Sequence, residues 1–235
     1  MSSLWAVVPA AGFGRRMAAE VPKQYLSLAG HPLLEHTLRS LLSCAEIRGV
    51  VVVLDPADRR ADNIPSLYDP RVLRAAGGAE RADSVLSGLE SLVEQADESD
   101  WVLVHDAARP CLPLADLQRL IDTAKSTGRG TILAQPCNDT MKRVDVDGAV
   151  LETVDRERLW RAQTPQMFPL GPLRQALAQC REHSVAVTDE AMAMEWAGHT
   201  VALIEGPLCN IKVTLPHDLK MAEWFLKSMS VESSA

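Results

Sequence analysis

The chain has 235 residues, of which 47% are hydrophobic and 23% are charged, and its formal net charge is −7. This length and apolar content suffice for a sizeable core and exclude a chain that is disordered throughout. A general nucleic-acid binder carries an excess of basic residues, so this acidic composition predicts no nucleic-acid partner.

No apolar run in the chain approaches the roughly 18 residues that a membrane span needs. The start, Met-Ser-Ser-Leu-Trp, lacks the basic residues and the long apolar core of a signal peptide. The five cysteines are widely spaced, odd in number and form no C-x-x-C pair. We therefore expect a cytoplasmic protein with reduced thiols, without a zinc site and without membrane association.

Strand and helix patterns alternate from Leu4 to Ala134. Short apolar runs predict buried strands at Leu4–Val8, Gly49–Leu54, Trp101–Val104 and Thr131–Ala134. Apolar spacing predicts helices at Pro32–Leu42, Ala82–Val93 and Leu114–Ala124, with Val93 on the buried face of the second. This alternation indicates βαβ units, and the continuously apolar strands predict a mostly parallel sheet covered on both faces.

The pattern changes after Gln135. Polar and apolar residues alternate on both sides of Asp147-Gly148, which predicts a β-hairpin between Asn138 and Arg156. A lone hairpin is marginal in water, so we expect it to pack on its own domain or on a second subunit. The remaining predicted elements are helices near Leu170–Cys180 and Asp189–Trp196, a strand at Val201–Ile204 and a helix from Pro216 to about Met229. The sequence thus predicts one domain, residues 1–235, with an arm at about 137–156.

A turn of small residues, Ala10-Ala11-Gly12, follows the first predicted strand. The G-x-G-x-x-G and P-loop patterns both fail here, because Gly14 is followed by Arg15-Arg16. Small residues let backbone amides approach a ligand, and two guanidiniums with Lys23 suit a polyphosphate. The alternative is a solvated basic loop in a tight turn.

Polar residues also follow the other predicted strands. Gly77-Gly78-x-x-Arg81-x-x-Ser84 predicts a turn entering a helix, either as a ligand-reading loop or as a plain helix cap. After Trp101–Val104, Asp106 and Arg109 suit a metal, a ribose or a phosphate, or else an internal ion pair, while His105 is expected to be structural.

Two further motifs each allow a functional and a structural interpretation. Asp145-Val-Asp147 resembles a D-x-D metal motif, but it lies at the predicted hairpin turn, where Asp is expected for backbone reasons. In Asn210-Ile-Lys212-Val-Thr214, a lysine between apolar residues on a predicted short strand indicates a candidate site.

In chain order these motifs resemble one family, the 2-C-methyl-D-erythritol 4-phosphate cytidylyltransferases of the non-mevalonate isoprenoid pathway. The matching pieces are P-A-A-G-F-G-R-R-M, P-K-Q-Y, G-G-x-x-R-A-D-S, V-L-V-H-D-A-A-R-P, D-T-M-K, V-D-R, Q-T-P-Q-M-F, T-D-E-A and N-I-K-V-T. They cover nearly the whole chain. The resemblance implies a doubly wound, Rossmann-like α/β nucleotidyltransferase with a projecting β-hairpin arm that clasps the partner in a homodimer. It also implies Mg²⁺-dependent transfer of CMP from CTP to 2-C-methyl-D-erythritol 4-phosphate, with release of pyrophosphate.

The resemblance further implies a role for each matching residue. The catalytic residues would be Arg16, Lys23, Arg156 and Lys212. The residues that bind CTP would be Ala10, Ala11, Gly12, Gly14, Arg15, Gly78, Arg81, Ser84, Asp106 and Ala107. The residues that bind methylerythritol phosphate would be Asp106, Arg109, Thr140, Thr164 and Thr188. In this family Thr140 and Arg156 serve the neighbour's site, and Mg²⁺ is held mainly by phosphates and water, with Asp106 the one candidate protein ligand.

One departure from the family and several alternatives stay open. Close relatives often carry Asp where this chain has Cys209, just before Asn210; we expect the loss of that carboxylate to have a modest effect. The nearest alternatives are a ribitol-phosphate cytidylyltransferase and a sugar-phosphate uridylyltransferase. A non-catalytic nucleotide sensor is disfavoured by the retained basic residues, and a dinucleotide-dependent oxidoreductase by the missing third glycine.

Overall fold

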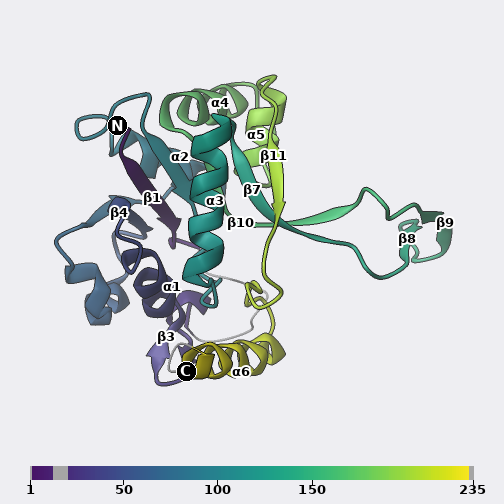
Figure 1. Ribbon diagram of the computed structural model, residues 1–235, viewed down its shortest axis with the longest axis horizontal. Coiled ribbons are helices and arrows are strands. Elements are labelled where there is room, and N and C mark those ends of the chain that lie inside the picture. Colours follow the sequence, from purple (N-terminus) through teal and green to yellow (C-terminus); the bar gives the residue numbers. More distant parts are fainter. Residues whose placement is uncertain (1, 13–20, 233–235) are drawn as a thin grey trace.

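The computed structural model describes residues 2–12 and 21–232. In that part of the chain seven strands form one sheet, in the order β11-β7-β10-β6-β1-β4-β5 (Figure 1). Its strands are β1 (Leu4–Pro9), β4 (Ile47–Leu54), β5 (Val72–Ala76), β6 (Trp101–Val104), β7 (Thr131–Pro136), β10 (Trp160–Pro169) and β11 (Ala202–Glu205). Neighbouring strands are parallel except for β10, which is antiparallel to both β6 and β7. The mostly parallel sheet that the sequence predicts is therefore confirmed.

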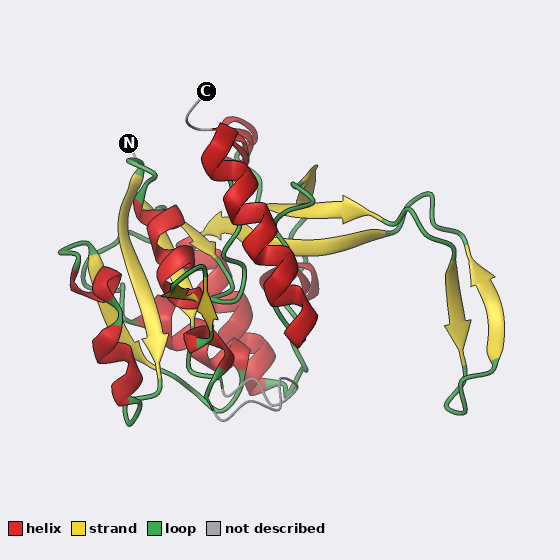
Figure 2. Ribbon diagram, turned by 90° about the horizontal axis from the view of Figure 1, so that it is seen from below, coloured by secondary structure: helices red, strands yellow, loops and turns green. Residues whose placement is uncertain are grey.

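Helices cover both faces of this sheet (Figures 1 and 2). One face packs against α1 (Leu33–Leu42) and α3 (Leu114–Thr127), and the other against α2 (Arg81–Glu90), α4 (Leu170–Glu182) and α5 (Glu190–Trp196). Alternate residues of β1 explain why the strand is apolar throughout. Leu4, Ala6 and Val8 belong to the first core, whereas Trp5 and Val7 belong to the second. The doubly wound architecture is thus confirmed.

A third, smaller core lies under the C-terminal helix α6 (Pro216–Glu232), at one end of the body (Figure 1). It joins α6 to the short strand β2 (Ser27–Leu28), to Leu33 of α1 and to Val213. Strand β2 pairs in turn with β3 (His31–Pro32). Short 3₁₀ turns lie at Lys23–Tyr25, Arg59–Asn63 and Pro65–Tyr68. Across the described ranges, every helix is too short or too polar to cross a membrane.

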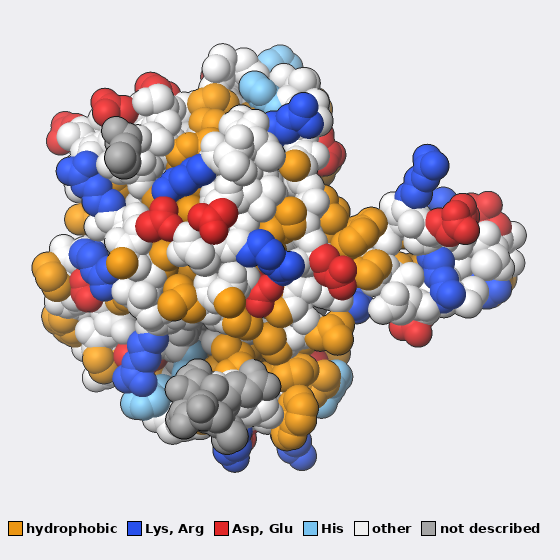
Figure 3. Space-filling model, viewed as in Figure 1, with side chains coloured by type: hydrophobic (Ala, Val, Ile, Leu, Met, Phe, Trp, Pro, Cys, Tyr) orange, Lys and Arg blue, Asp and Glu red, His pale blue; other side chains and the backbone are white. Residues whose placement is uncertain are grey.

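The predicted hairpin arm is confirmed as β8 (Met141–Val144) paired with β9 (Val150–Val154). It extends away from the body beyond the ends of β7 and β10 (Figures 1 and 2). At its turn, Asp145 Oδ1 accepts hydrogen bonds from the backbone N–H groups of Asp147 (3.0 Å) and Ala149 (2.9 Å). The interpretation of this aspartate as a turn residue is therefore correct. Basic and acidic side chains alternate on the outer part of the arm (Figure 3).

The structure corrects three details of the sequence prediction. Helix α2 ends at Glu90, so Val93 is 50% exposed and Leu92 takes the buried position instead. Residues 210–214 form no strand; the backbone N–H of Val213 fixes this segment by donating to the carbonyl of Ala108 (2.8 Å). Strands β5 and β10 were not predicted, because β5 is a half-exposed edge strand and β10 carries buried polar residues and a proline in its middle.

Candidate active site

The carboxyl ends of four parallel strands lie at one edge of the sheet. Because β1, β4, β5 and β6 run in the same direction, the loops that follow them meet there. They surround a cavity of about 630 Å³. Its described lining is Pro9, Ala10, Ala11, Gly12, Lys23, Gln24, Asp55, Gly78, Ala79, Glu80, Arg81, Ser84, Asp106, Ala107, Ala108 and Lys212. Most of the residues predicted to bind CTP are therefore brought together.

The loop after β1 is held in place by its backbone. The N–H of Ala10 donates to the carbonyl of Val53 (2.8 Å), and the buried Gln24 side chain donates to the carbonyl of Ala10 (2.7 Å). Gln24 was not predicted as a site residue, although it stands in the P-K-Q-Y motif that the chain shares with the family. The predicted residues Gly14, Arg15 and Arg16 lie outside the described residues.

The loop before α2 is both a helix cap and part of the cavity wall. The backbone N–H of Gly78 donates to Ser84 Oγ (3.1 Å), and that hydroxyl donates to the carbonyl of Glu80 (3.1 Å). Glu80 and Asp83 also form a reciprocal capping box at the start of the helix. The helix-cap interpretation of the glycine turn is therefore confirmed, and the hydroxyl of Ser84 shapes the loop. That the loop reads a ligand stays a prediction.

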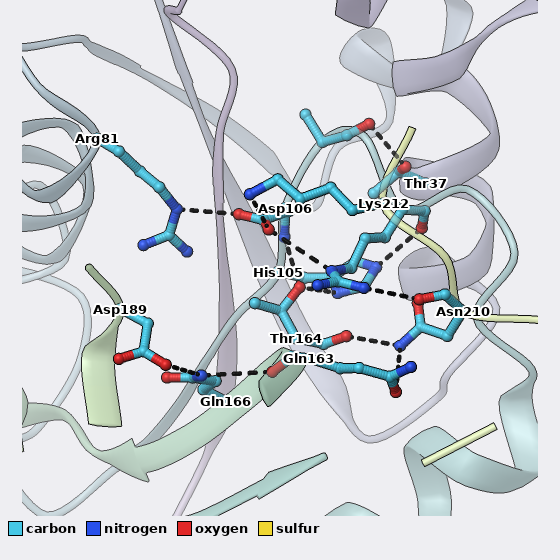
Figure 4. A network of polar contacts seen from close by, with 12 residues as sticks. Thr37, Arg81, His105, Asp106, Gln163, Thr164, Gln166, Asp189, Asn210 and Lys212 are labelled. Carbon is cyan, nitrogen blue, oxygen red and sulfur yellow. Dashed lines mark hydrogen bonds and ion pairs between the residues drawn. The ribbon is translucent and has the colours of Figure 1, made fainter. Parts of the chain in front are cut away.

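Asp106 lies at the centre of a cluster of charges (Figure 4). Its carboxylate is 2.9 Å from Arg81 Nε, 2.8 Å from Lys212 Nζ and 3.6 Å from Arg109 Nε. Burial by itself would raise the pKa of Asp106, but the three cations outweigh burial and hold this pKa well below its usual range. Asp106 is therefore an anion at every physiological pH. It forms the internal ion pair that the sequence allows, and it does so inside a cavity.

A second, smaller cavity of about 170 Å³ adjoins this cluster. Its described lining is Arg81, Asp106, Arg109, Ala162, Gln163, Thr164, Gln166, Thr188, Asp189 and Lys212. Arg109, Thr164 and Thr188, all predicted to bind the second substrate, thus lie together. The two cavities share Arg81, Asp106 and Lys212.

His105 is buried beneath this cluster and both of its ring nitrogens have partners. Nε2 lies 3.1 Å from the carbonyl of Arg109, and Nδ1 lies 3.0 Å from the hydroxyl of Thr164. The carbonyl can only accept, so the proton of the neutral ring is on Nε2 and the hydroxyl donates to Nδ1. The same hydroxyl accepts the backbone N–H of Asp106 (3.0 Å). Burial lowers the pKa of His105 to about 4. His105 is therefore neutral and structural, as the sequence predicts.

Asn210 anchors the segment that carries Lys212, and it was not predicted as a site residue. It is fully buried, and its Nδ2 donates to the carbonyl of Thr164 (2.8 Å) while its own carbonyl accepts Arg109 Nη1 (2.7 Å). The neighbouring Cys209 is partly buried against the core under α6. These contacts join β10 to the lysine segment (Figure 4).

Thr140 and Arg156 lie apart from both cavities. Each is exposed on the arm, and Arg156 donates to the carbonyl of Asn138. In the part of the chain that the structure describes, no three His, Cys, Asp or Glu side chains are grouped to hold a metal.

The chain matches the family profile described as 2-C-methyl-D-erythritol 4-phosphate cytidylyltransferase over residues 4–228. It is 53% identical to the protein of that name from Aeromonas hydrophila, over 99% of this chain and 93% of the relative. Among solved structures, it is similar to a 4-diphosphocytidyl-2C-methyl-D-erythritol synthase, with a TM-score of 0.82, 39% identity and coverage of 96% and 99% of the two chains. It is also similar to the Francisella tularensis 2-C-methyl-D-erythritol 4-phosphate cytidylyltransferase, with a TM-score of 0.82, 33% identity and coverage of 95% and 100%.

Proposed function

The chain belongs to the 2-C-methyl-D-erythritol 4-phosphate cytidylyltransferase family, and we infer that it transfers CMP from CTP to 2-C-methyl-D-erythritol 4-phosphate, a step toward isoprenoid precursors. It is an enzyme, a nucleotidyltransferase. The residue roles that follow are our proposal. The observation that carries it is the pair of cavities that share Arg81, Asp106 and Lys212.

Each cavity suits one of the two substrates. CTP fits the larger one, where the backbone of the loops after β1 and β5 can approach a nucleotide closely. The smaller alcohol phosphate fits the second cavity, beside Arg109, Thr164 and Thr188. The reacting atoms then meet at the shared cluster, next to the Lys212 ammonium.

The reaction needs no general base. A phosphate oxygen of the alcohol phosphate attacks the α-phosphorus of CTP, the bond from that phosphorus to the bridging oxygen breaks, and pyrophosphate leaves with the electron pair. The second pKa of a phosphate monoester is about 6, so the nucleophile is mostly ionised at pH 7. His105 is buried with both nitrogens engaged, which agrees with a mechanism that takes no proton there.

The barrier is repulsion between two anions, so catalysis rests on positioning and on cations. Lys212 lies where the two cavities meet, and Lys23 lines the nucleotide cavity. Arg16 is proposed to stabilise the transition state on the ground of sequence alone, and Arg15 to raise the local potential. The described lining of the larger cavity carries three basic and three acidic side chains. Because these charges cancel, we propose that Arg15 and Arg16 supply the net attraction for a triphosphate.

Asp106 does not fit a protein-held Mg²⁺. The ion prefers several oxygen ligands in octahedral geometry, whereas both oxygens of the Asp106 carboxylate already face cations. We therefore propose that Mg²⁺ arrives with the triphosphate, held by phosphate oxygens and water.

The arm is proposed to hold a second copy of the chain. Its strands expose Val144, Val150 and Leu151 at 50%, 60% and 62%, and a two-stranded hairpin of this kind is marginal without a partner. Thr140 and Arg156 would then reach the neighbour's site. The five free cysteines support a place in the reducing cytoplasm.

The direct test is pyrophosphate release from CTP and Mg²⁺ with 2-C-methyl-D-erythritol 4-phosphate, and with UTP as the control nucleotide. With 2-C-methyl-D-erythritol 4-phosphate present, we expect pyrophosphate release from CTP and none from UTP. Equal or faster release with ribitol 5-phosphate, or with a sugar phosphate and UTP, would instead identify one of the alternative transferases. CTP binding without any release would identify a sensor.

A further inference from the structure

Glu190, the first residue of α5, points a buried carboxylate at the charged cluster. Its exposed fraction is 0%, and it binds Arg81 through both oxygens, at 2.6 Å to Nη1 and 3.1 Å to Nη2. The remaining nitrogen of that guanidinium, Nε, donates to Asp106 at 2.9 Å. Glu190, Arg81, Asp106 and Lys212 thus form a row of alternating charges.

This carboxylate is not needed to attach α5 to the body. The N-terminus of the helix is capped by Asp189, whose side chain accepts the N–H of Met192 (3.1 Å). The Gln166 side chain accepts the N–H of Ala191 (2.8 Å) and donates to Asp189 (2.8 Å). An isolated buried charge is costly, so the position of Glu190 is explained by the guanidinium that it binds.

Glu190 and Asp106 together fix the orientation of the Arg81 guanidinium. Two carboxylates hold all three guanidinium nitrogens, which fixes both the rotation and the position of the group. Without Glu190, Nη1 and Nη2 of Arg81 would lose the partner that holds them, and Arg81 could turn toward the phosphates of a substrate. Asp106 would then lose the partner that holds its Oδ1 oxygen between the two cavities.

We infer that Glu190 is a positioning residue of the transferase: through Arg81 it sets the place of Asp106, and thereby of Lys212, at the junction of the two substrate cavities. The inference rests on the proposed function, because it assigns a task in that reaction. It also explains why the T-D-E-A motif carries a glutamate next to the helix-capping aspartate.

The test compares Glu190→Gln with Glu35→Gln. Glu35 is a matched control, because it is 1% exposed and paired with Arg39 at 2.7 Å, but it lines neither cavity. Displacing a reacting group by about 1 Å lowers the rate by up to roughly a hundredfold. We expect Glu190→Gln to lower kcat by roughly tenfold to a hundredfold with a smaller change in either KM. Glu35→Gln should lower thermal stability with kcat unchanged. Wild-type kcat in Glu190→Gln overturns the inference.

A double variant asks whether Glu190 acts through Arg81. Arg81→Met leaves the buried glutamate unpaired, so adding Glu190→Gln should raise the melting temperature and lower kcat no further. Losses of kcat that multiply in the double variant overturn the inference. If Glu190→Gln does not fold, Glu190→Asp keeps the charge and should show the same loss of kcat in a milder form.

A structural readout separates this inference from the proposed function. A crystal structure of Glu190→Gln, or of Glu190→Asp, should show the contact between Arg81 Nε and Asp106 broken or displaced, whichever substrates the enzyme uses. An unchanged contact overturns the inference even if the wild type is active. A wild type that releases no pyrophosphate overturns the proposed function and leaves this structural result to decide the positioning role.

Discussion

Buried polar side chains fix the residues that line the two cavities from beneath. The hydroxyl of Thr164 accepts the backbone N–H of Asp106 and lies against His105, whose other nitrogen faces the carbonyl of Arg109. Each polar group in this chain of contacts has a partner, which a buried network requires. Thr164, predicted to bind substrate, therefore also fixes the backbone that carries Asp106.

His105 makes the stability of the protein depend on pH. Its pKa is about 4 in the folded protein and 6.5 in a model group, because burial disfavours the charged ring. The unfolded chain then binds the extra proton between these values, so the free energy of unfolding falls as pH drops from about 6.5 to 4. Each pKa unit is worth about 1.4 kcal/mol, which makes the loss on the order of 3 kcal/mol over this window.

Urea denaturation at several pH values checks this expectation against His105→Gln. The variant should be less stable at pH 7.5, because it loses hydrogen bonds, but its stability should fall less between pH 6.5 and 4. Other groups that titrate in this range contribute to both proteins and cancel in the comparison. Parallel pH curves for the two proteins would contradict the prediction.

The sequence predicted most individual residues of the two cavities, because their motifs follow strands of recognisable pattern. Lys23, Gly78, Asp106 and Lys212 all line the larger one. Glu190 and Asn210 were missed as site residues, although both stand in quoted motifs. Their roles depend on partners far along the chain, Arg81 and Thr164, and a single sequence does not reveal which buried polar groups will meet.

At the scale of elements, the site depends on how closely two loops approach at the sheet edge. Gly77, directly after β5, lies against Ala11, the second residue after β1, and a Cβ on this glycine would overlap the Ala11 methyl group. The N–H of Gly77 also donates to the carbonyl of Leu54 at the end of β4 (2.8 Å). The glycine is therefore required for close packing of the loops.

Gly77→Ala should weaken CTP binding. Overpacking costs about 1–3 kcal/mol, so displacement of the glycine loop should raise the KM for CTP by roughly fivefold to 150-fold. Gly128→Ala is a control at the end of α3, where a φ of +65° makes alanine strained while open space surrounds the site. It should lower the melting temperature without changing this KM. An unchanged KM in Gly77→Ala would show that the loop accommodates the methyl group without effect on the nucleotide.

The elements that the sequence missed are those whose structure depends on distant neighbours. Strand β10 enters the middle of the sheet antiparallel, and its polar residues Gln163, Thr164 and Gln166 are buried because other segments supply their partners. Its pattern is typical of a loop. Edge strand β5 pairs on one side alone within the described sheet, so it has no continuous apolar run to mark it.

At the scale of the whole molecule, the arm extends away from the body (Figure 1), whereas the residues that line both cavities belong to the body. Lys23 and Lys212 line the same cavity of one chain, whereas Arg156 is exposed beside the arm. If two copies exchange arms about a twofold axis, each site combines Lys23 and Lys212 of one chain with Arg156 of the other. The exposure of Val144, Val150 and Leu151 on the arm would then be a property of the single chain.

Mixing inactive variants tests this arrangement. In a heterodimer of Lys23→Ala with Arg156→Ala, one site lacks both residues and the other has both, so turnover per dimer should recover to about half that of the wild type. The matched control pairs Lys23→Ala with Lys212→Ala, two residues of the same cavity, for which neither site is intact and no recovery is expected. Heterodimers are isolated with two different affinity tags before pyrophosphate release is measured. Inactive heterodimers of the first pair would mean that Arg156 serves its own chain or has no catalytic role. Recovery in both pairs would show that the two subunits share further active-site residues besides those of the arm.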